Sequence, residues 1–458
     1  MDLKELYEKL NEYMEKDVEL SGWIRNHRKQ KEFGFIDFSD GTCFEHAQIV
    51  YDNKLTNFEE ISKYHIGSAI KVIGTVVKSP KEEQVFEIRA KDIVLLGDCP
   101  EDYPIQPKRH SREFLREQAY LRPRTNLFQA VFRVRSIAAY AIHKYFNENG
   151  YIYFHAPLIT ASDCEGAGDM FHVTTFDLAN IPMEDGKVNY NEDFFSKEAS
   201  LTVSGQLEAE TFALAYKKTY TFGPTFRAEN SNTKTHASEF WMIEPEMAFC
   251  DLFEDMDIME DMLKYVVQYV LDNAESEMKF LDSFVEKGLI DKLNKLVNSK
   301  FTRVTHEEVI DILQKADVKW EFEPKQGEDI AREHEKYITE HFNGPVFIYN
   351  WPKDIKAFYM KQNDDGKTVA AVDLEVPGAG ELMGGSQRED DYDKLITRMK
   401  ELDINTEDMA WYLNLRKYGG CVHSGFGMGF DRLLIYLTGV DNIRDVIPYY
   451  RTPGACDF

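Results

Sequence analysis

Two arginines in the sequence stand where they could neutralise a polyphosphate. Arg227 lies in the run FRAE after an aromatic-rich stretch, and Arg432 ends the glycine-spaced run GFGMGFDR. A guanidinium is planar and always charged, so it suits phosphate oxygens on which negative charge builds up during a reaction. The same residues could also form ion pairs on a solvated surface, so the elements around them decide between the two interpretations.

Residues 220–246 predict two antiparallel strands joined by a long polar loop. Alternating Tyr, Phe and Thr are typical of a strand, and a Gly-Pro pair interrupts it before Phe226. Arg227 and Glu229 would share one face, which is costly in a buried sheet unless that face lines a site. A surface hairpin with an ion-paired face is the alternative.

Residues 425–433 predict a glycine-spaced strand that runs into a helix, with Arg432 at the junction. This stretch and the Arg227 stretch, in that order, resemble motifs 2 and 3 of the class II aminoacyl-tRNA synthetases. A helical pattern at 125–150, then a strand and Pro157, resembles motif 1, which forms the dimer interface in that family. A plain amphipathic helix would look the same, so the expected homodimer depends on the family alone.

The composition fits a globular protein. A chain of 458 residues is long enough for two or three domains, and its 43% hydrophobic and 29% charged residues are ordinary values. The N-terminal residues contain no signal-peptide pattern, and no apolar run is long enough to span a membrane. The six cysteines form no C-x-x-C pair, so we expect a reduced, cytoplasmic protein without a zinc site or disulfide framework.

The net charge of −26 argues against a nucleic-acid partner when it is taken as a single value. The positive charges are clustered, however, in residues 25–31 and again between Lys108 and Arg124. An acidic body with a basic N-terminal region suits local docking of RNA, and a solvated charged face is the alternative.

The N-terminal region predicts an OB-fold barrel, because five strand-like segments surround one short helical segment at 57–64. The expected strands are 17–26, 33–39, 44–51, 68–78 and 84–96. Residues 21–24 and the basic residues after them resemble the first strand of the anticodon-binding domain in the aspartate/asparagine/lysine subgroup. That resemblance implies that Phe35 stacks on the central anticodon base, that Gln48 reads it, and that Arg28 lies nearby; Phe35 could instead be a barrel-core residue.

The resemblance covers nearly the whole chain and implies an α+β protein with three parts. Residues 1–98 would be the OB-fold anticodon-binding domain, and the proline-containing segment 99–124 would be a hinge. Residues 125–458 would be the class II catalytic domain, an antiparallel sheet flanked by helices.

The resemblance also implies an amino-acid pocket. Glu165, in a small-residue loop that could equally be a plain turn, would face the substrate ammonium group. Ser204 and Gln206 would contact the amino acid, Arg388 its side chain, and Glu244 is preferred over Glu246 as the facing acid. Each of these assignments is what the resemblance to this subgroup implies. The aspartate enzymes have a lysine three residues after the glutamine, whereas this chain has Ala209, which favours a neutral amide side chain.

The ATP site follows from the same two motifs. Arg227 and Arg432 would be the catalytic residues, Glu229 would meet the adenine amino group, and His236 the γ-phosphate. The resemblance further implies that Phe240 stacks on adenine and that the backbone of Gly427 and Gly429 approaches the nucleotide. Thr235 holds a place where related enzymes often have an arginine, which weakens the expected γ-phosphate contact.

Asp373 and Glu381 are paired carboxylates on either side of a predicted turn. Within a class II catalytic domain such a pair would hold Mg²⁺, whose hard oxygen ligands include the phosphates of ATP. A solvated hairpin is the alternative interpretation of the spacing.

The implied reaction has two steps, activation of L-asparagine by ATP and transfer of the asparaginyl group to tRNA(Asn). Three alternatives remain at this point. An aspartate enzyme of relaxed tRNA specificity is disfavoured by Ala209, and a non-catalytic tRNA-binding relative by the intact set of arginines and carboxylates. A paralogue that makes free amino acids is disfavoured by the N-terminal barrel.

Overall fold

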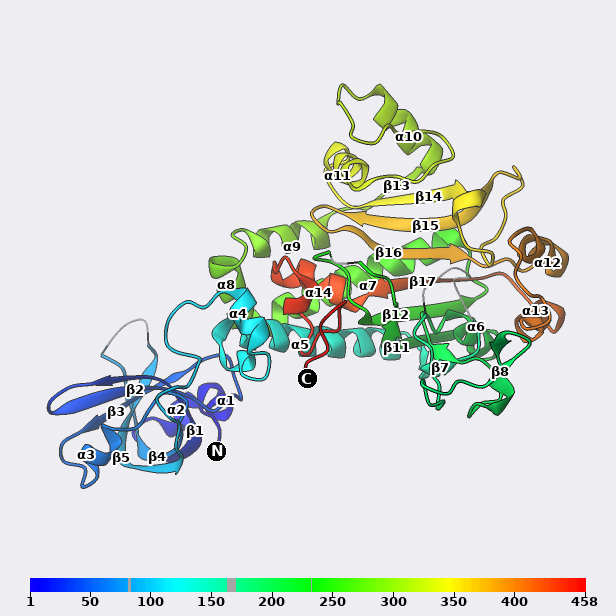
Figure 1. Ribbon diagram of the computed structural model, residues 1–458. Helices are drawn as coiled ribbons and strands as arrows, with labels where there is room; N and C mark the ends of the chain where they lie inside the picture. The colour runs from blue at the N-terminus through cyan, green and yellow to red at the C-terminus, as the bar shows by residue number, and fades with distance from the viewer. Residues whose placement is uncertain (81–83, 163–169, 232) are drawn as a thin grey trace. The chain divides into compact units, whose positions relative to one another are not determined.

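The computed structural model describes residues 1–80, 84–162, 170–231 and 233–458 (Figure 1). The chain forms two compact units, Met1–Ala130 and Val131–Phe458. Each unit has buried apolar clusters of its own. None of the helices in the described ranges is long and apolar enough to cross a membrane.

The first unit contains a closed five-stranded barrel with the strand order β1-β2-β3-β5-β4. The strands are β1 (Asp17–Lys29), β2 (Phe33–Ser39), β3 (Ala47–Asp52), β4 (Ala69–Lys78) and β5 (Phe86–Gly97). The helix α3 (Phe58–Ile61) lies between β3 and β4 in the chain, and α1 (Leu3–Glu8) and α2 (Leu10–Tyr13) precede the barrel. The predicted OB-fold barrel is confirmed.

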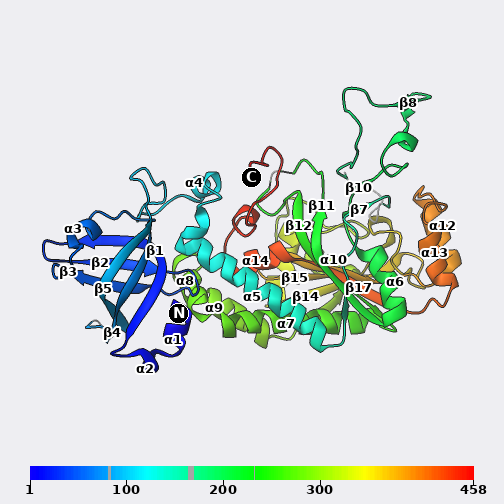
Figure 2. The same cartoon turned by 90° about the horizontal axis from the view of Figure 1, so that it is seen from below.

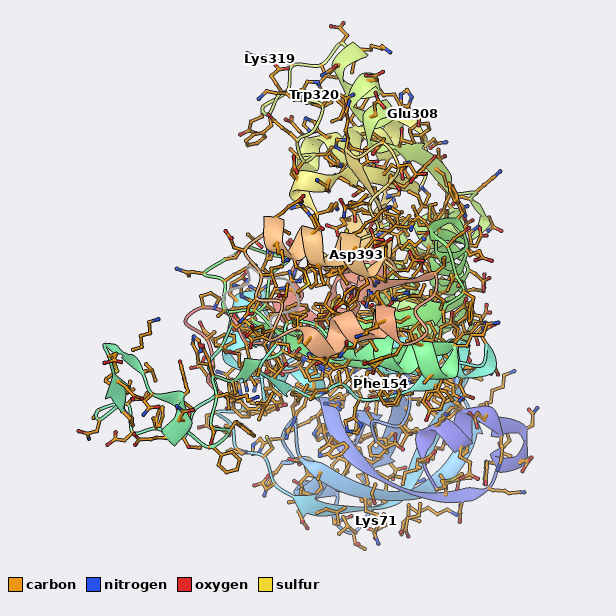
Figure 3. The ribbon with its side chains drawn as sticks, turned by 90° about the vertical axis from the view of Figure 1, so that its right-hand side faces the viewer. Lys71, Phe154, Glu308, Lys319, Trp320 and Asp393 are labelled. Carbon is orange, nitrogen blue, oxygen red and sulfur yellow. The ribbon has the colours of Figure 1, made fainter. Side chains whose placement is uncertain are left out.

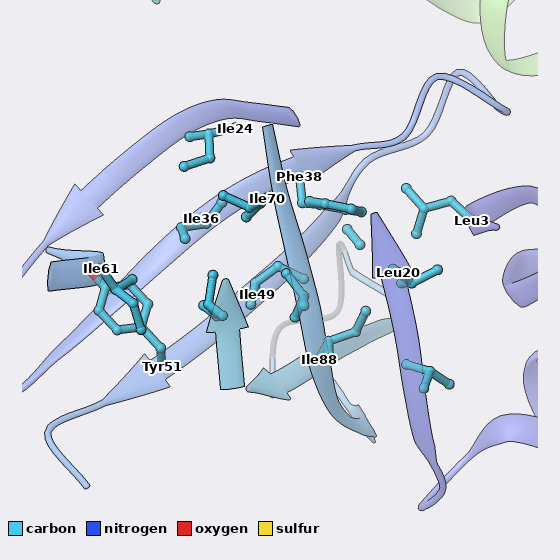
Figure 4. Close-up of a cluster of buried hydrophobic side chains, with 14 of the residues drawn as sticks. Leu3, Leu20, Ile24, Ile36, Phe38, Ile49, Tyr51, Ile61, Ile70 and Ile88 are labelled. Carbon is cyan, nitrogen blue, oxygen red and sulfur yellow. The ribbon is translucent and has the colours of Figure 1, made fainter. Parts of the chain in front are cut away.

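The barrel closes around alternating apolar side chains. Leu20, Ile36, Ile49 and Ile88 are at most 1% exposed and point inward from four strands, and Leu3 of α1 adds to the same cluster (Figure 4). Side chains along a strand point alternately to its two faces, so the residues between these positions face outward. The outward set is therefore free to form a recognition surface.

Residues 98–125 contain only short helical segments, α4 (Arg112–Glu117) and the 3₁₀ turn η1 (Arg122–Arg124). Their prolines restrict the backbone, as the sequence predicts. Arg25 of β1 donates to the Arg124 carbonyl at 3.0 Å, which attaches this segment to the barrel. The helix α5 (Asn126–Glu148) follows and continues into the second unit.

The second unit is organised on an eight-stranded sheet with the order β13-β14-β15-β16-β17-β12-β11-β6 (Figure 1). The strands are β6 (Ile152–Tyr153), β11 (Lys218–Phe226), β12 (Glu239–Ala248), β13 (Thr302–Thr305), β14 (Val346–Pro352), β15 (Thr368–Val376), β16 (Gly380–Gln387) and β17 (His423–Gly429). The six central strands are antiparallel, and the two edge pairs, β13–β14 and β11–β6, are parallel.

Helices flank this sheet, as the sequence predicts. The helix α7 (Leu252–Asn273) packs across β15, β16 and β17 (Figure 2), and its start is fixed by a capping box between Asp251 and Glu254. The helix α6 (Gln206–Tyr216) packs on β11 and β12, and α14 (Phe430–Thr438) continues directly from β17. The remaining helices are α8 (Glu275–Phe284), α9 (Leu289–Asn298), α10 (His306–Lys315), α11 (Arg332–His341), α12 (Tyr392–Glu401) and α13 (Ala410–Lys417).

Two peripheral segments complete the second unit. Trp320, beyond the end of α10, donates from its indole nitrogen to the Leu313 carbonyl at 3.2 Å (Figure 3). The strand β7 (Ile159–Thr160) pairs with β10 (Ser200–Leu201). Between them in the chain, β8 (Met183–Glu184) pairs with β9 (Lys187–Val188) in a largely exposed segment.

Candidate active site

A cavity of about 350 Å³ opens on the face of the sheet around β12, β16 and β17. Every predicted ATP, amino-acid and metal residue that the structure describes lines this cavity. They are Ser204, Gln206, Arg227, Glu229, His236, Phe240, Glu244, Asp373, Glu381, Arg388, Gly427, Gly429 and Arg432. Glu165 lies outside the described residues. The sequence therefore brings together, from segments far apart in the chain, side chains of opposite charge around one space.

The β11–β12 hairpin positions Arg227. The backbone nitrogen of Arg227 donates to the Ser238 carbonyl at 3.0 Å, which closes the base of the polar loop. The Arg227 guanidinium lies 5.5 Å from the centroid of the Phe240 ring, so a cation and an aromatic face stand side by side. Glu229 is exposed in the loop. This arrangement can receive a planar base and the phosphate attached to it.

The β17–α14 junction positions Arg432. Asp431, which is 1% exposed, accepts from the Trp241 backbone nitrogen at 2.9 Å and pairs with Arg135 of α5. These contacts fix the first turn of α14 against β12. Arg432 itself donates to the Glu381 carbonyl at 3.4 Å and keeps its charge at the cavity wall.

The spaced glycines serve two purposes. A Cβ on Gly425 would lie 2.3 Å from the Glu246 carboxylate, so this glycine makes room for a buried acid within the protein. Gly427 lines the cavity, and a Cβ there would lie 2.8 Å from the Met242 methyl group. The expectation that these glycines let the backbone approach a nucleotide therefore stays a prediction for Gly427 and Gly429.

His236 lies at the positive end of the cavity. Its ring contacts the Thr233 hydroxyl, and burial followed by the nearby Arg432 charge lowers the pKa of His236. A ring held neutral among arginines can donate to an anion without adding a further repelled charge.

An acidic end faces the arginines. The carboxylates of Asp373 and Glu381 converge: their oxygens lie 3.3 and 3.2 Å from the point where a Cβ on Gly384 would stand. Burial raises the pKa of Asp373 to about 6, and Glu381 adds to that rise, while an ion pair with Lys356 at 2.6 Å opposes it. The pocket therefore holds carboxylates that are short of compensating positive charge.

The acidic end fits a magnesium ion. Glu375, two residues along β15 from Asp373, does not itself line the cavity; its buried Oε2 accepts no hydrogen bond from the described residues, and burial, then nearby acids that include Glu381 and Asp373, raises its pKa well above the usual range. Across the described ranges, no three His, Cys, Asp or Glu side chains group as a metal site. Mg²⁺ commonly takes only one or two carboxylates and completes its octahedron with phosphates and water, so this pair suits an ion that arrives with a nucleotide.

The opposite end of the cavity is built around Glu244. Its carboxylate accepts from the Gly205 nitrogen at 3.0 Å, from the Thr221 hydroxyl at 3.2 Å and from the Ser204 hydroxyl. The backbone nitrogen of Gln206 in turn donates to Ser204 Oγ at 3.1 Å. The first residues of α6 are thus locked onto β11 and β12.

Arg388 is buried against an acid at the floor of the same end. Its Nε donates to Glu246 Oε2 at 3.2 Å, a second guanidinium nitrogen contacts Glu246 Oε1, and a third donates to Ser386 Oγ at 2.8 Å. Arg388 and Glu246 are 3% and 0% exposed in their side chains. Ala209 of α6 is fully buried and does not line the cavity.

Sequence reasoning missed several residues of the site. Lys356 and Tyr359 line the cavity, but they lie in a segment that matches neither arginine motif. Sequence reasoning preferred Glu244 to Glu246, whereas both line the cavity and Glu246 is the partner of Arg388. That pairing depends on strands far apart in the chain, so no local pattern indicates it.

The three predicted anticodon residues lie together on the barrel, with Arg28 exposed and Gln48 buried. The Arg28 guanidinium is 5.4 Å from the centroid of the Phe35 ring and donates to Gln48 Oε1 at 3.3 Å. Phe35 is half-buried and lies outside the apolar core of the barrel. Gln48 Nε2 donates to Glu87 Oε2 at 3.3 Å, and Glu87 is the member of this group that sequence reasoning missed.

Comparison with known proteins places both units. The family model of class II tRNA synthetases (D, K and N) matches residues 111–453, and that of the OB-fold nucleic acid binding domain matches residues 18–96. The asparagine–tRNA ligase of Acholeplasma laidlawii is 59% identical over 99% of this chain and 98% of its own. That of Clostridium tetani is 56% identical over 100% and 99%. The crystal structure of asparaginyl-tRNA synthetase from Pyrococcus horikoshii complexed with asparaginyl-adenylate has a TM-score of 0.84 at 31% identity and covers 97% of both chains.

Proposed function

The chain belongs to the class II tRNA synthetases of the D, K and N group, and we propose that it activates L-asparagine with ATP and transfers it to tRNA(Asn). One observation carries the choice of amino acid beyond the family. The floor of the amino-acid end holds Arg388 already paired with Glu246, and position 209, where the aspartate enzymes have a lysine, is an alanine. This floor has hydrogen-bond donors but no spare charge for a carboxylate side chain.

In the first step, a carboxylate oxygen of asparagine attacks the α-phosphorus of ATP, and the bond to the β-phosphate oxygen breaks. The products are asparaginyl-adenylate and pyrophosphate. Arg227 would neutralise the charge that builds on the α-phosphate, and Phe240 beside it would stack on adenine. Arg432 and His236 would hold the departing phosphates. Fixed donors in a partly enclosed cavity need little reorganisation during the reaction. Donors that are already in position in this way are usually the largest source of an enzyme's rate acceleration.

Asp373 and Glu381 would hold Mg²⁺ when ATP is bound. The ion would draw negative charge away from the phosphates. Lys356 keeps Asp373 oriented through their 2.6 Å ion pair before the nucleotide arrives.

Asparagine would enter the end built around Glu244. Arg388 would donate to the side-chain amide oxygen, and Ser204 and Gln206 would contact the rest of the amino acid. A site that satisfies the amide leaves buried groups unpaired when aspartate enters, and such a mismatch can discriminate by about 10⁴–10⁵. Glu165 would close over the ammonium group, as the family resemblance implies.

In the second step, a terminal ribose hydroxyl of the tRNA attacks the asparaginyl carbonyl carbon, and AMP leaves. The barrel would select tRNA(Asn) through its anticodon. Phe35 would stack on a base, while Gln48 and Arg28 would contact its edge and backbone. The family also supports a homodimer and a cytoplasmic location, which we include in the proposal.

The test is ATP–pyrophosphate exchange by the purified protein with asparagine, aspartate and lysine in parallel. We expect exchange with asparagine alone. Exchange with aspartate would keep the activation chemistry and overturn the side-chain assignment. Exchange with none of the three would contradict the proposed activity and favour a tRNA-binding relative.

A further inference from the structure

A buried carboxylate lies directly behind the amino-acid end of the cavity. Glu210 of α6 is 0% exposed and does not line the cavity. Four donors converge on it: Gln206 Nε2 at 3.3 Å, the Tyr412 hydroxyl at 2.7 Å, Arg416 at 2.9 Å and His423 Nε2 at 2.8 Å. Burial alone would raise the pKa of Glu210, but Arg416 and His423 hold it below its usual range. Glu210 therefore acts as an acceptor only.

Its contact with Gln206 fixes the orientation of that side chain. Gln206 and Glu210 are four residues apart on α6 and so lie on the same face of the helix. A carboxamide carries donors on its nitrogen and acceptors on its oxygen. Because Glu210 can only accept, Gln206 must turn its nitrogen toward Glu210. Its oxygen is then the atom presented to the cavity that Gln206 lines.

We propose that Glu210 is a positioning residue that holds the Gln206 carbonyl oxygen toward the amino-acid site as an acceptor for an N–H group of the substrate. The inference rests on the proposed function and deepens it. Glu210 touches no reacting atom, and it acts through Gln206. A substrate N–H group can donate to the Gln206 oxygen, whereas a substrate oxygen that carries no proton is repelled by it.

The variant Glu210→Gln tests this because it should turn Gln206 around. Arg416 and His423 donate to the same carboxylate oxygen, Oε2, so they would claim the one carbonyl oxygen of the introduced amide. The introduced NH₂ group would then face Gln206, which would have to rotate and offer its own oxygen. The substrate would meet a donor where it needs an acceptor.

The measurement is asparagine-dependent ATP–pyrophosphate exchange by the full chain. We expect the KM for asparagine to rise about 10- to 100-fold in Glu210→Gln. The variant would lose the hydrogen bond from a substrate N–H group to the Gln206 oxygen, and the loss is of the size found for hydrogen bonds that involve a charged group. The KM for ATP should stay unchanged. A purely structural defect would instead lower the active fraction and kcat while leaving both KM values alone.

Two further variants keep the test decisive if Glu210→Gln unfolds partly. Tyr412→Phe removes the other donor to Glu210 Oε1, the oxygen that Gln206 contacts, but leaves the Gln206 contact itself, so the KM for asparagine should match that of the wild type. Adding Glu210→Gln to Gln206→Ala should raise KM no further, since coupled residues are not additive. Additive effects, or an equal rise in Tyr412→Phe, would overturn the inference. Absence of exchange by the wild type would instead contradict the proposed function.

Discussion

The two units each contain a glutamine whose nitrogen is held by a buried glutamate, and the two pairs differ in their surroundings. In the catalytic unit, Gln206 and Glu210 are neighbours on one helix, and Glu210 also accepts from the buried side chains of Arg416 and His423. In the barrel, Gln48 and Glu87 are paired across the parallel strands β3 and β5. Among the described residues, Glu87 forms an ion pair with Arg89, whose Nε lies 3.7 Å from Glu87 Oε1 and whose side chain is 68% exposed.

The same hydrogen bond between a glutamine nitrogen and a glutamate can therefore hold the glutamine more or less rigidly, depending on the surroundings. The charges around Glu210 are enclosed, so the acceptor cannot be exchanged for a donor without rearrangement. Glu87 lies beside solvated groups, and an amide in its place could turn to suit its neighbours. We therefore expect rigid recognition of the amino acid and more tolerant recognition of the anticodon. The predictions that follow would break or sharpen this contrast.

The largest effect is expected from Arg227→Lys, which keeps the charge and removes the planar fork. Loss of one oriented donor at a reacting phosphate costs about 10²- to 10³-fold in rate. Asparagine-dependent pyrophosphate exchange should fall by that amount, while binding of tRNA(Asn) in a filter assay stays at the wild-type level. Lys234→Arg, in the exposed loop nearby, is the matched control. Loss of tRNA binding in Arg227→Lys would show that the two sites are not separable.

The next effect is expected from Phe35→Ala on the barrel. Stacking on one base contributes about 1–3 kcal/mol, so affinity for tRNA(Asn) should fall about 5- to 150-fold. Exchange without tRNA should not change. Leu96→Ala removes an apolar side chain that is 58% exposed in the same unit and should leave tRNA affinity intact. Equal losses in both variants would indicate a general effect of surface apolar area.

The substitution Glu87→Gln makes the comparison direct, because it is the same change as Glu210→Gln. A neutral hydrogen bond is worth about 0.5–1.5 kcal/mol, so we expect the KM for tRNA(Asn) to rise by no more than about tenfold. Aminoacylation kinetics with excess asparagine measure it. A rise as large as that in Glu210→Gln for asparagine would contradict the difference between the two environments.

The sequence predicted the residues that line the cavity and those grouped on the barrel better than the residues that hold them in place. Arg227, Arg432, Gln48 and Gln206 lie in local motifs with recognisable spacing. The strand before Arg227, the strand-to-helix junction at Arg432 and the strand that carries Gln48 are correctly predicted, whereas no helix was predicted at Gln206. The pairings of Glu87 with Gln48 and of Glu246 with Arg388 were not predicted, because they depend on strand register, which a single sequence does not determine. Glu210 was accessible in principle, since four-residue spacing on a helix places it beside Gln206.

Burial resolves two of the alternatives weighed from the sequence. The Arg227 hairpin is not a solvated surface hairpin, because Glu244 and Glu246 on its second strand are 6% and 0% exposed. The pair Asp373 and Glu381 is likewise not a fully solvated hairpin, since Asp373 is 8% exposed. Burial depends on which elements cover the sheet, and that is a property of the whole chain.

The smallest effect is expected from a change in pH acting on stability through His27. It tests whether the barrel is the more solvated of the two regions. His27 of β1 contacts the Tyr64 carbonyl through Nδ1 at 3.0 Å and the Tyr51 hydroxyl through Nε2 at 2.7 Å. The neutral ring satisfies both, because Nδ1 donates and Nε2 accepts. Burial lowers the pKa of His27, the Tyr64 carbonyl opposes this, and the Lys29 charge adds to it.

The sign follows from proton linkage. The folded-state pKa of His27 is lower than that of an unfolded histidine, which is about 6.5, so the unfolded chain takes up the proton first as pH falls. The contribution of His27 to stability is full above about pH 6.5 and is lost as pH falls through its folded-state pKa. We expect the stability advantage of the wild type over His27→Gln, measured by urea unfolding of the full chain, to be larger at about pH 7.5 than at about pH 5.5. An advantage that grows on acidification would mean that the barrel stabilises the charged ring, and the barrel would then be the less tolerant region.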